Sequence, residues 1–479
     1  MSGVAKVLCC EIMRLFALTL LAATVTVTAS AQLTPDTEAK VVAAAEKVLH
    51  DTGVPSASVG IAQNGKVVYA RAFGLANVTP PKPATASMAY PIGSISKQFT
   101  ATAVLLLQQE GKLSLDDKVA KYFPELTRAN EVSLRNLMTM TSGYEDDLPQ
   151  DYIIPALRRP TTPEQVMHEW AEKPLDFDPG AEWQYSNTNY ATVALIVQKV
   201  AGVPFAQFLR QRVLAPLDLQ GVFNTYTQRE KLEVTGYVSN AMAAPRVLPL
   251  EAPGWYVGDG DLAMPASTLL AWDIGIMHQS LLSPASYKEF ETPFVLKSGE
   301  SSGYGLGVRI RMRNGHRELE HSGEVGGYVA ENVVYPEDGV AIVALTNEVA
   351  SSAAGDIVNA ITPLVLPAAV PPAAAPDTFA PQLQAILGGL QKGQIDRGLL
   401  TPNCITYFDA DTLADFQSTL APLGTVVSAT RTYSAPRGGM TFSGYRVAFS
   451  GGSAVRVSVA VKPDGKIEQL LVIGKTGNP

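Results

Sequence analysis

The sequence predicts an α+β fold: an antiparallel sheet flanked by helices, a helical subdomain beside it, and a small second α+β domain at the C-terminus. Three observations lead to this prediction. A β-hairpin pattern stands near the start of the chain. Four strand patterns follow residue 303, and a proline- and alanine-rich segment separates them from further strand patterns near the end.

The first half of the chain predicts a helix, a hairpin and then a largely helical stretch. Residues 38–50 carry apolar side chains at helical spacing. Strand patterns over 57–62 and 67–70 flank Asn64-Gly65, a dipeptide typical of tight hairpin turns. A helix is predicted over 94–110, ending before Gly111. Residues 115–225 are predicted to be mostly helices and loops, including a helix over 189–200.

Strand patterns dominate after Gly303. They cover 304–312, 317–322, 327–335 and 340–346, with turns at Asn314-Gly315 and at 337–339, and a helix pattern over 353–364 follows. We expect the early hairpin and this late meander to share one sheet. The helical middle would then stand beside the sheet and leave a cleft between the two parts.

The domain boundaries follow from composition. Residues 1–31 predict a secretory signal peptide, because Arg14 precedes an apolar run and Ala29-Ser30-Ala31 fits a cleavage site. A retained membrane anchor is the alternative, and Met13 is an alternative start. Residues 32–365 are the predicted main domain and 366–381 a Pro/Ala linker. About 378–479 form a small accessory domain with two helix patterns and four strand patterns, over 426–433, 441–449, 454–461 and 466–473.

Charge, cysteine and histidine usage narrow the function classes. The net charge of −8, without Lys/Arg runs, argues against nucleic acid or an anionic membrane surface as a partner. Once the signal is removed, Cys404 is the only cysteine, so no intramolecular disulfide is expected and Cys404 is predicted to be a small buried apolar residue. The histidines lack metal-ligand spacing, so no metal is expected. No organic cofactor is expected either. An exported chain of two or three domains without disulfides fits the bacterial periplasm or the cell exterior, and no span is predicted after signal removal.

Ser94 and Lys97 form the only S-x-x-K pattern of the chain. Side chains three apart on a helix share one face, about 5–6 Å apart at Cβ, so a lysine kept neutral by desolvation can take the serine proton. Chance alone gives roughly one such pattern in a chain of this length. Context comes from three later stretches. These are Tyr185-Ser186-Asn187 after a Pro-Gly turn, Gly258-Asp259-Gly260-Asp261-Leu262 before a predicted helix, and His321-Ser322-Gly323 at the end of a predicted strand.

With these motifs in this order, the chain resembles serine hydrolases of the β-lactamase and penicillin-binding-protein superfamily. The resemblance is to the branch of class C β-lactamases, D-alanyl-D-alanine carboxypeptidases and related esterases. It covers about residues 35–365, with further landmarks at 91–94, 111–117, 134–137 and 141–143.

The resemblance implies roles for five residues. Ser94 would attack a carbonyl and become acylated, while Lys97 and Tyr185 would share the work of general base and acid. Asn187 would hold the substrate amide. The backbone N–H groups of Ser94 and Glu324 would hold the oxyanion.

The third motif departs from class C β-lactamases, which usually carry Lys-Thr-Gly where this chain has His321-Ser322-Gly323. A histidine is only partly charged near pH 7, so it attracts a substrate carboxylate less than a lysine does and leaves Ser322 as the neutral hydrogen-bond donor. This weakens the β-lactamase interpretation. The substrate classes left open are a D-alanyl peptide, a β-lactam and a small ester or amide. The alternatives are an esterase with the same residues or a slow-turnover penicillin-binding sensor protein, and the oligomeric state stays open.

Two other patterns imitate catalytic motifs. Lys475-Thr476-Gly477 matches the missing third motif, but no strand follows it to close a site. Gly299-x-Ser301-x-Gly303 matches a nucleophile elbow, but strand residues follow it where that motif needs a helix. Neither is expected to be catalytic. Trp255 and Tyr256 are expected either at the mouth of the cleft or in the core.

Overall fold

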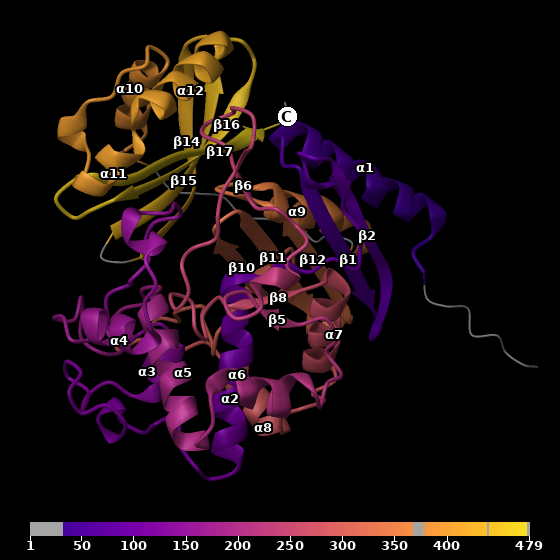
Figure 1. Cartoon of the computed structure of the whole chain (residues 1–479), viewed down its shortest axis with the longest axis vertical. Helices are drawn as coiled ribbons and strands as arrows, with labels where there is room; N and C mark the ends of the chain where they lie inside the picture. Colours follow the sequence, from indigo (N-terminus) through magenta and orange to yellow (C-terminus); the bar gives the residue numbers. More distant parts are fainter. Residues whose placement is uncertain (1–31, 367–376, 378, 438–439, 477–479) are drawn as a thin grey trace, which may run out of the picture.

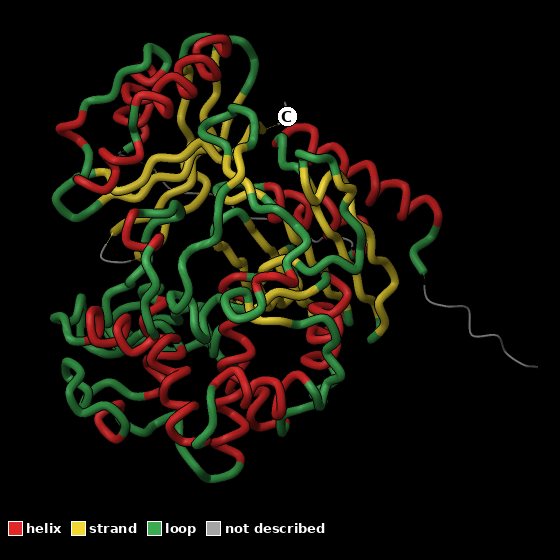
Figure 2. The backbone as a smooth tube through the Cα atoms, viewed as in Figure 1, coloured by secondary structure: helices red, strands yellow, loops and turns green. Residues whose placement is uncertain are grey.

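The structure, a computed structural model, describes residues 32–366, 377, 379–437 and 440–476. The predicted signal peptide and most of the predicted linker lie outside these residues. Within them the α+β prediction is confirmed. Figures 1 and 2 show a large sheet packed against helices, a mainly helical part next to it, and a smaller unit of helices and strands at the C-terminus.

The main sheet has seven strands in the order β3-β2-β1-β12-β11-β10-β9. The early hairpin meets the late meander where β1 and β12 pair in antiparallel fashion, with Gly60 opposite Val343. This pairing confirms that both ends of the main domain complete one sheet. The strands are Ser56–Gln63 (β1), Lys66–Asn77 (β2), Lys82–Pro83 (β3), Arg309–Arg313 (β9), His316–Val325 (β10), Tyr328–Tyr335 (β11) and Val340–Thr346 (β12).

The strand predicted over 304–312 begins later than expected, at Arg309. Tyr304 forms only an isolated bridge with Arg309. Residues 303–308 contain three glycines and turn instead of extending, as glycine-rich segments do.

Helices cover both faces of the main sheet. Pro35–Thr52 (α1) and Ala353–Val365 (α9) pack on one face around Val41, Ile342 and Ile357. Ala266–Met277 (α7) packs on the other face, next to the helical part. That part contains Ser96–Gln109 (α2), Leu134–Met138 (α3), Pro163–Ala171 (α4), Asn187–Ala201 (α5), Phe205–Leu209 (α6) and Pro284–Phe290 (α8).

Six short strands form two small sheets in the connections. One has the order β4-β8-β5 and the other β13-β6-β7. Their bounds are Tyr90–Pro91 (β4), Phe223–Asn224 (β5), Tyr237–Val238 (β6), Arg246–Val247 (β7), Leu262–Met264 (β8) and Glu348–Val349 (β13).

Helix α2 lies in the middle of the molecule. Every residue from Ser96 to Leu107 is buried, as expected for a helix that neighbours enclose on all sides. The predicted start at residue 94 is corrected to Ser96, because Gly93–Ile95 form a 3₁₀ turn. Side chains three apart still align across such a turn, so Lys97 lies inside the protein with Ser94 next to it. No single helix of the described ranges is long and apolar enough to cross a membrane; α5 passes that test only together with Phe205–Leu214, at a bend of 75°.

The C-terminal unit has its own four-stranded sheet, in the order β14-β15-β16-β17. Its core includes Cys404, which is 0% exposed and unpaired, as predicted. Three helices precede the strands instead of two, because one of them is too short to show helical periodicity. The bounds are Ala380–Leu390 (α10), Pro402–Tyr407 (α11), Ala410–Leu420 (α12), Val426–Arg437 (β14), Met440–Phe449 (β15), Ala454–Val461 (β16) and Ile467–Thr476 (β17).

Candidate active site

The structure brings Ser94 and Lys97 together at the buried start of α2. The Lys97 Nζ donates a hydrogen bond of 2.9 Å to the Ser94 Oγ. Lys97 is 0% exposed, whereas Ser94 is partly exposed and lines a cavity of about 460 Å³. The serine oxygen therefore faces the cavity while the lysine approaches it from the protein interior.

The Lys97 Nζ has three hydrogen-bond partners. Besides Ser94, Nζ donates to the Asn187 Oδ1 at 2.7 Å and to the Asp259 carbonyl oxygen at 3.0 Å. The rings of Tyr185 and Tyr190 lie with their centroids 5.0 and 5.7 Å from Nζ. Fixed contacts on several sides therefore hold the amine at the serine, in the position that proton transfer requires.

Asn187 is placed to position the lysine. Its backbone N–H donates to the Asp146 Oδ1 at 2.9 Å, and its Nδ2 donates to the same oxygen at 3.1 Å. Because its Oδ1 accepts from Lys97, the amide joins the start of α5 to α2. The Nδ2 group carries a second hydrogen, and Asn187 lines the cavity. The substrate contact that the sequence suggested is thus compatible with this positioning role.

The backbones around Ser94 and Glu324 lie close enough together to form an oxyanion hole. A Cβ on Gly323 would lie 1.9 Å from the Ile92 carbonyl oxygen and 3.0 Å from the Ser94 nitrogen. A Cβ on Gly93, whose φ is +50°, would lie 2.5 Å from the Glu324 nitrogen. Only glycine fits at these two positions. This close approach brings the backbone nitrogens of Ser94 and Glu324 near each other at the Ser94 side chain, the arrangement that an oxyanion hole requires.

His321 is buried and neutral. Burial and the positive charge of Lys97 lower the pKa of His321 to about 3. Its Nδ1–H donates to the Ser322 carbonyl oxygen at 2.5 Å, and its Nε2 accepts from the Tyr304 hydroxyl at 2.8 Å. The expectation of a partly charged His321 near pH 7 is therefore wrong, because burial keeps water from the ring and the Lys97 charge disfavours a second positive charge. Ser322 is exposed and faces the cavity.

Two aspartates behind Lys97 were not assigned a role from the sequence, although the segment containing them was noted. Asp259 and Asp261 are 1% and 2% exposed. Burial raises the pKa of each to about 7, and the Lys97 charge, 3.9 Å from the Asp259 Oδ2, opposes the rise at Asp259. Asp261 has a different partner, because its Oδ2 accepts from Asn224. The spacing of residues in the sequence does not predict these raised pKa values, because they result from burial in the folded protein.

Replacing Asp261 with asparagine should change the pH dependence of stability. The free energy of unfolding of the variant, relative to that of wild type, should be higher at alkaline pH than at acid pH. The pKa of Asp261 is about 7 in the folded protein against an ordinary 3.8. The folded state therefore binds the proton more tightly, and the wild-type carboxyl loses its stabilising proton as pH rises toward 7. Asparagine has no such dependence. Urea unfolding at pH 4 and pH 8 should show the variant gaining roughly 3 kcal/mol on wild type between the two.

The matched control is Asp411→Asn, at an exposed aspartate in the first turn of α12. That substitution should change the free energy of unfolding little and by a similar amount at both pH values. An Asp261→Asn protein with the same pH dependence as wild type would contradict the burial argument.

The remaining sequence candidates lie outside the catalytic cluster. Lys475 is exposed at the end of β17 and does not line the cavity, while Gly477 lies outside the described residues. Ser301 lies in a loop, as predicted for the imitation elbow. Trp255 and Tyr256 are both buried, and only Tyr256 lines the cavity. No group of three or more His, Cys, Asp or Glu side chains in the described part of the chain could hold a metal ion.

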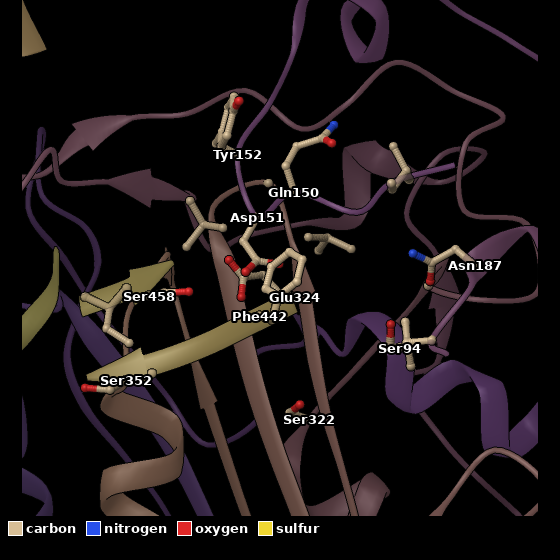
Figure 3. A pocket seen from close by; sticks show the side chains of 18 of the residues that line it. Ser94, Gln150, Asp151, Tyr152, Asn187, Ser322, Glu324, Ser352, Phe442 and Ser458 are labelled. Atoms are coloured by element: carbon tan, nitrogen blue, oxygen red, sulfur yellow. The ribbon is translucent and has the colours of Figure 1, made fainter. Parts of the chain in front are cut away.

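The cavity has its catalytic groups on one side and the C-terminal sheet on the other. Tyr185 is partly exposed in it, and the centroid of its ring lies 6.1 Å from that of His321. Figure 3 shows Ser94 and Asn187 together, with Phe442 of β15 across the pocket from them. The sequence predicted an accessory or binding role for the C-terminal domain and no place in the site, because contacts between residues so far apart in the chain leave no local pattern.

Comparison with known families and curated proteins gives consistent matches. A family model described as Beta-lactamase matches residues 41–361. The chain is 28% identical over 302 residues to "Penicillin-binding protein 4*" of Bacillus subtilis (strain 168), covering 60% of this chain and 67% of that protein. It is 26% identical over 326 residues to "Protein flp" of Staphylococcus aureus (strain NCTC 8325 / PS 47), covering 66% and 64%. The matches thus span about two thirds of these relatives' own length.

Solved structures share the fold. The octameric penicillin-binding protein homologue from Pyrococcus abyssi matches with a TM-score of 0.60 and 23% identity, over 92% of this chain and 98% of that one. D-amino acid amidase from Ochrobactrum anthropi SV3 matches with a TM-score of 0.59 and 20% identity, over 69% and 97%. EstCE1, a hydrolase with promiscuous acyltransferase activity, matches with a TM-score of 0.57 and 21% identity, over 69% and 98%.

Proposed function

The chain belongs to the beta-lactamase family of serine hydrolases, and from this membership we propose that it is an exported serine acyl-hydrolase working through a covalent acyl-enzyme. The observation that carries the proposal is the buried Lys97 Nζ, 2.9 Å from the Ser94 Oγ. Its proposed substrates are D-alanyl peptides, β-lactams and small esters or amides. Export to the periplasm or cell exterior is supported by the signal pattern of residues 1–31 alone.

In the proposed reaction the Ser94 oxygen attacks the substrate carbonyl carbon. The serine proton passes to the pair formed by Lys97 and Tyr185, which then protonates the leaving group. The N–H groups of Ser94 and Glu324 stabilise the negative oxygen of the tetrahedral intermediate. Water hydrolyses the acyl-enzyme in the second half of the reaction and restores Ser94.

The charges of the cavity favour substrates without a carboxylate next to the scissile bond. The neutral His321 supplies no cation, because its pKa is about 3. Two arginines line the cavity, and each lies beside an acid: Arg309 Nε is 3.3 Å from the Glu320 Oε2, and Arg456 pairs with Asp356. This arrangement supports the second candidate, an esterase or amidase that uses the same catalytic residues.

A substrate panel separates the proposed functions. Wild-type protein is incubated with a fluorescent penicillin and, separately, with p-nitrophenyl esters, small amides and D-alanyl peptides, and both labelling and turnover are followed. We expect ester hydrolysis to be faster than penicillin hydrolysis, because the site lacks an unpaired cation for the penicillin carboxylate. Fast labelling without turnover would instead favour a penicillin-binding protein or the slow sensor. Inactivity toward esters, amides, D-alanyl peptides and penicillins alike would contradict the proposed function.

A further inference from the structure

The C-terminal sheet turns one face toward the catalytic cavity. Side chains alternate along β15 and β16, so Tyr445, Val447, Val455 and Val457 point into the core of the C-terminal unit. The opposite face, here called the outer face, includes five residues that line the cavity together with Ser94 and Asn187: Phe442, Gly444, Arg456, Ser458 and Ile473. The outer face is therefore a wall of the cavity.

Phe442 is the large apolar side chain of this wall. It is 7% exposed, although it does not belong to the core of the C-terminal unit; with Met440 and Ala460 it forms a separate small cluster. In Figure 3, β15 carries Phe442 toward Glu324, the residue that follows the third motif. Its burial therefore comes from the position of the sheet against the main domain.

Specific polar contacts fix the outer face to the main domain. The Asp151 backbone N–H donates to the Gln469 Oε1 at 2.7 Å, and the Gln469 Nε2 donates back to the Asp151 Oδ2 at 3.0 Å. The Ser352 N–H donates to the Ile473 carbonyl oxygen at 3.1 Å. Gln469 is 0% exposed, so losing its paired bonds would leave buried polar groups unsatisfied. These contacts hold the wall at a set distance from Ser94.

From this arrangement we propose that the C-terminal sheet limits the catalytic cavity to small substrates with free ends, such as short peptides and small esters or amides. Peptides still attached to a polymer would be excluded. The proposal rests on the acyl-hydrolase function proposed above. A cavity of about 460 Å³ lies within the range that encloses a drug-sized ligand, about 300–1,000 Å³. A longer chain that extends toward the C-terminal sheet would have to displace β15.

The first test uses the full-length protein and p-nitrophenyl esters of increasing acyl length. The measured quantity is the ratio of kcat/KM for the octanoate to that for the acetate. Phe442→Ala should raise this ratio about tenfold or more, since single methylenes in apolar pockets already change selectivity by ~10–200-fold. Gln469→Ala, which releases the wall, should raise it as well. Val427→Ala, at a 61% exposed valine on β14 that does not line the cavity, should leave it unchanged.

A second test measures access to position 94 without catalysis. In a Ser94→Cys background, the labelling rates by small iodoacetamide and by a bulky polyethylene-glycol maleimide are compared, and the same protein with Ser94 intact gives the background. Cys404 is buried and its pKa is raised to about 12, so it contributes little. Adding Phe442→Ala or Gln469→Ala should speed the bulky reagent relative to the small one.

The two tests separate the possible failures. Wild-type protein that hydrolyses no ester would contradict the proposed function, while the thiol labelling would still report on the wall. The wall proposal would be overturned if the bulky reagent labelled the Ser94→Cys protein as fast as it labels the same protein with Phe442→Ala or Gln469→Ala added. An unchanged ester ratio in both variants of an active enzyme would overturn it too.

Discussion

Replacing Ser94 with alanine is expected to abolish hydrolysis and acyl-enzyme formation together. Ser94 is the nucleophile in the proposed reaction, and its oxygen lies 2.9 Å from the Lys97 amine. Removing the nucleophile of a serine hydrolase lowers kcat by on the order of 10⁶-fold. Ester hydrolysis and intact-mass spectrometry after incubation with a penicillin or an activated ester measure the two losses. The fold should persist, because a partly exposed hydroxyl contributes little to packing.

Ser301→Ala is the matched control. Ser301 is the centre of the imitation nucleophile elbow, and it is an exposed loop residue whose hydroxyl accepts only from the nearby Gly303 N–H among the bonds described for it. This variant should keep wild-type activity and the same mass increment. Activity that survives Ser94→Ala but is lost in Ser301→Ala would refute the assignment of the nucleophile.

Short-range patterns in the sequence predicted the sheet well. Asn64-Gly65 and Asn314-Gly315 have positive φ at all four residues, as the tight turns predicted there require. The prediction that the early hairpin and the late meander share one sheet is confirmed by the pairing of β1 with β12. Boundaries were predicted less well where glycines interrupt a strand pattern, as before Arg309, because turn formation competes there with sheet pairing.

The features of the candidate site divide in the same way into those that short motifs predict and those that depend on packing. The structure places the Lys97 amine in contact with Ser94, as the S-x-x-K pattern predicted, and also with Asn187, whose predicted role was to hold the substrate amide. The neutral state of His321 depends on the aromatic side chains packed around it, and the wall carrying Phe442 depends on domain packing. Neither property is encoded in residue spacing. Both bear on the choice of substrate, whereas the short motifs bear on the chemistry of acylation.

Replacing Lys97 with methionine should lower kcat by about 10²–10⁴-fold, the usual contribution of a general base, while leaving the fold intact. Methionine has a similar length and suits a side chain that is 0% exposed. The substitution leaves Asp259 without its cationic neighbour. The pKa of Asp259 is already about 7 with the Lys97 charge lowering it, so without that charge the carboxyl should stay protonated at neutral pH.

Measuring kcat together with urea unfolding of the Lys97→Met protein distinguishes a lost proton transfer from a lost fold. Lys199→Met is the matched control, because Lys199 is also a helix lysine, on α5, and its amine donates to the Tyr122 carbonyl oxygen at 2.5 Å. That variant should retain kcat within a few-fold. A Lys97→Met protein that folds and keeps wild-type kcat would place the base elsewhere, with Tyr185 the remaining candidate in the cavity. A folded protein with lost kcat would assign the proton transfer to the buried amine beside Ser94.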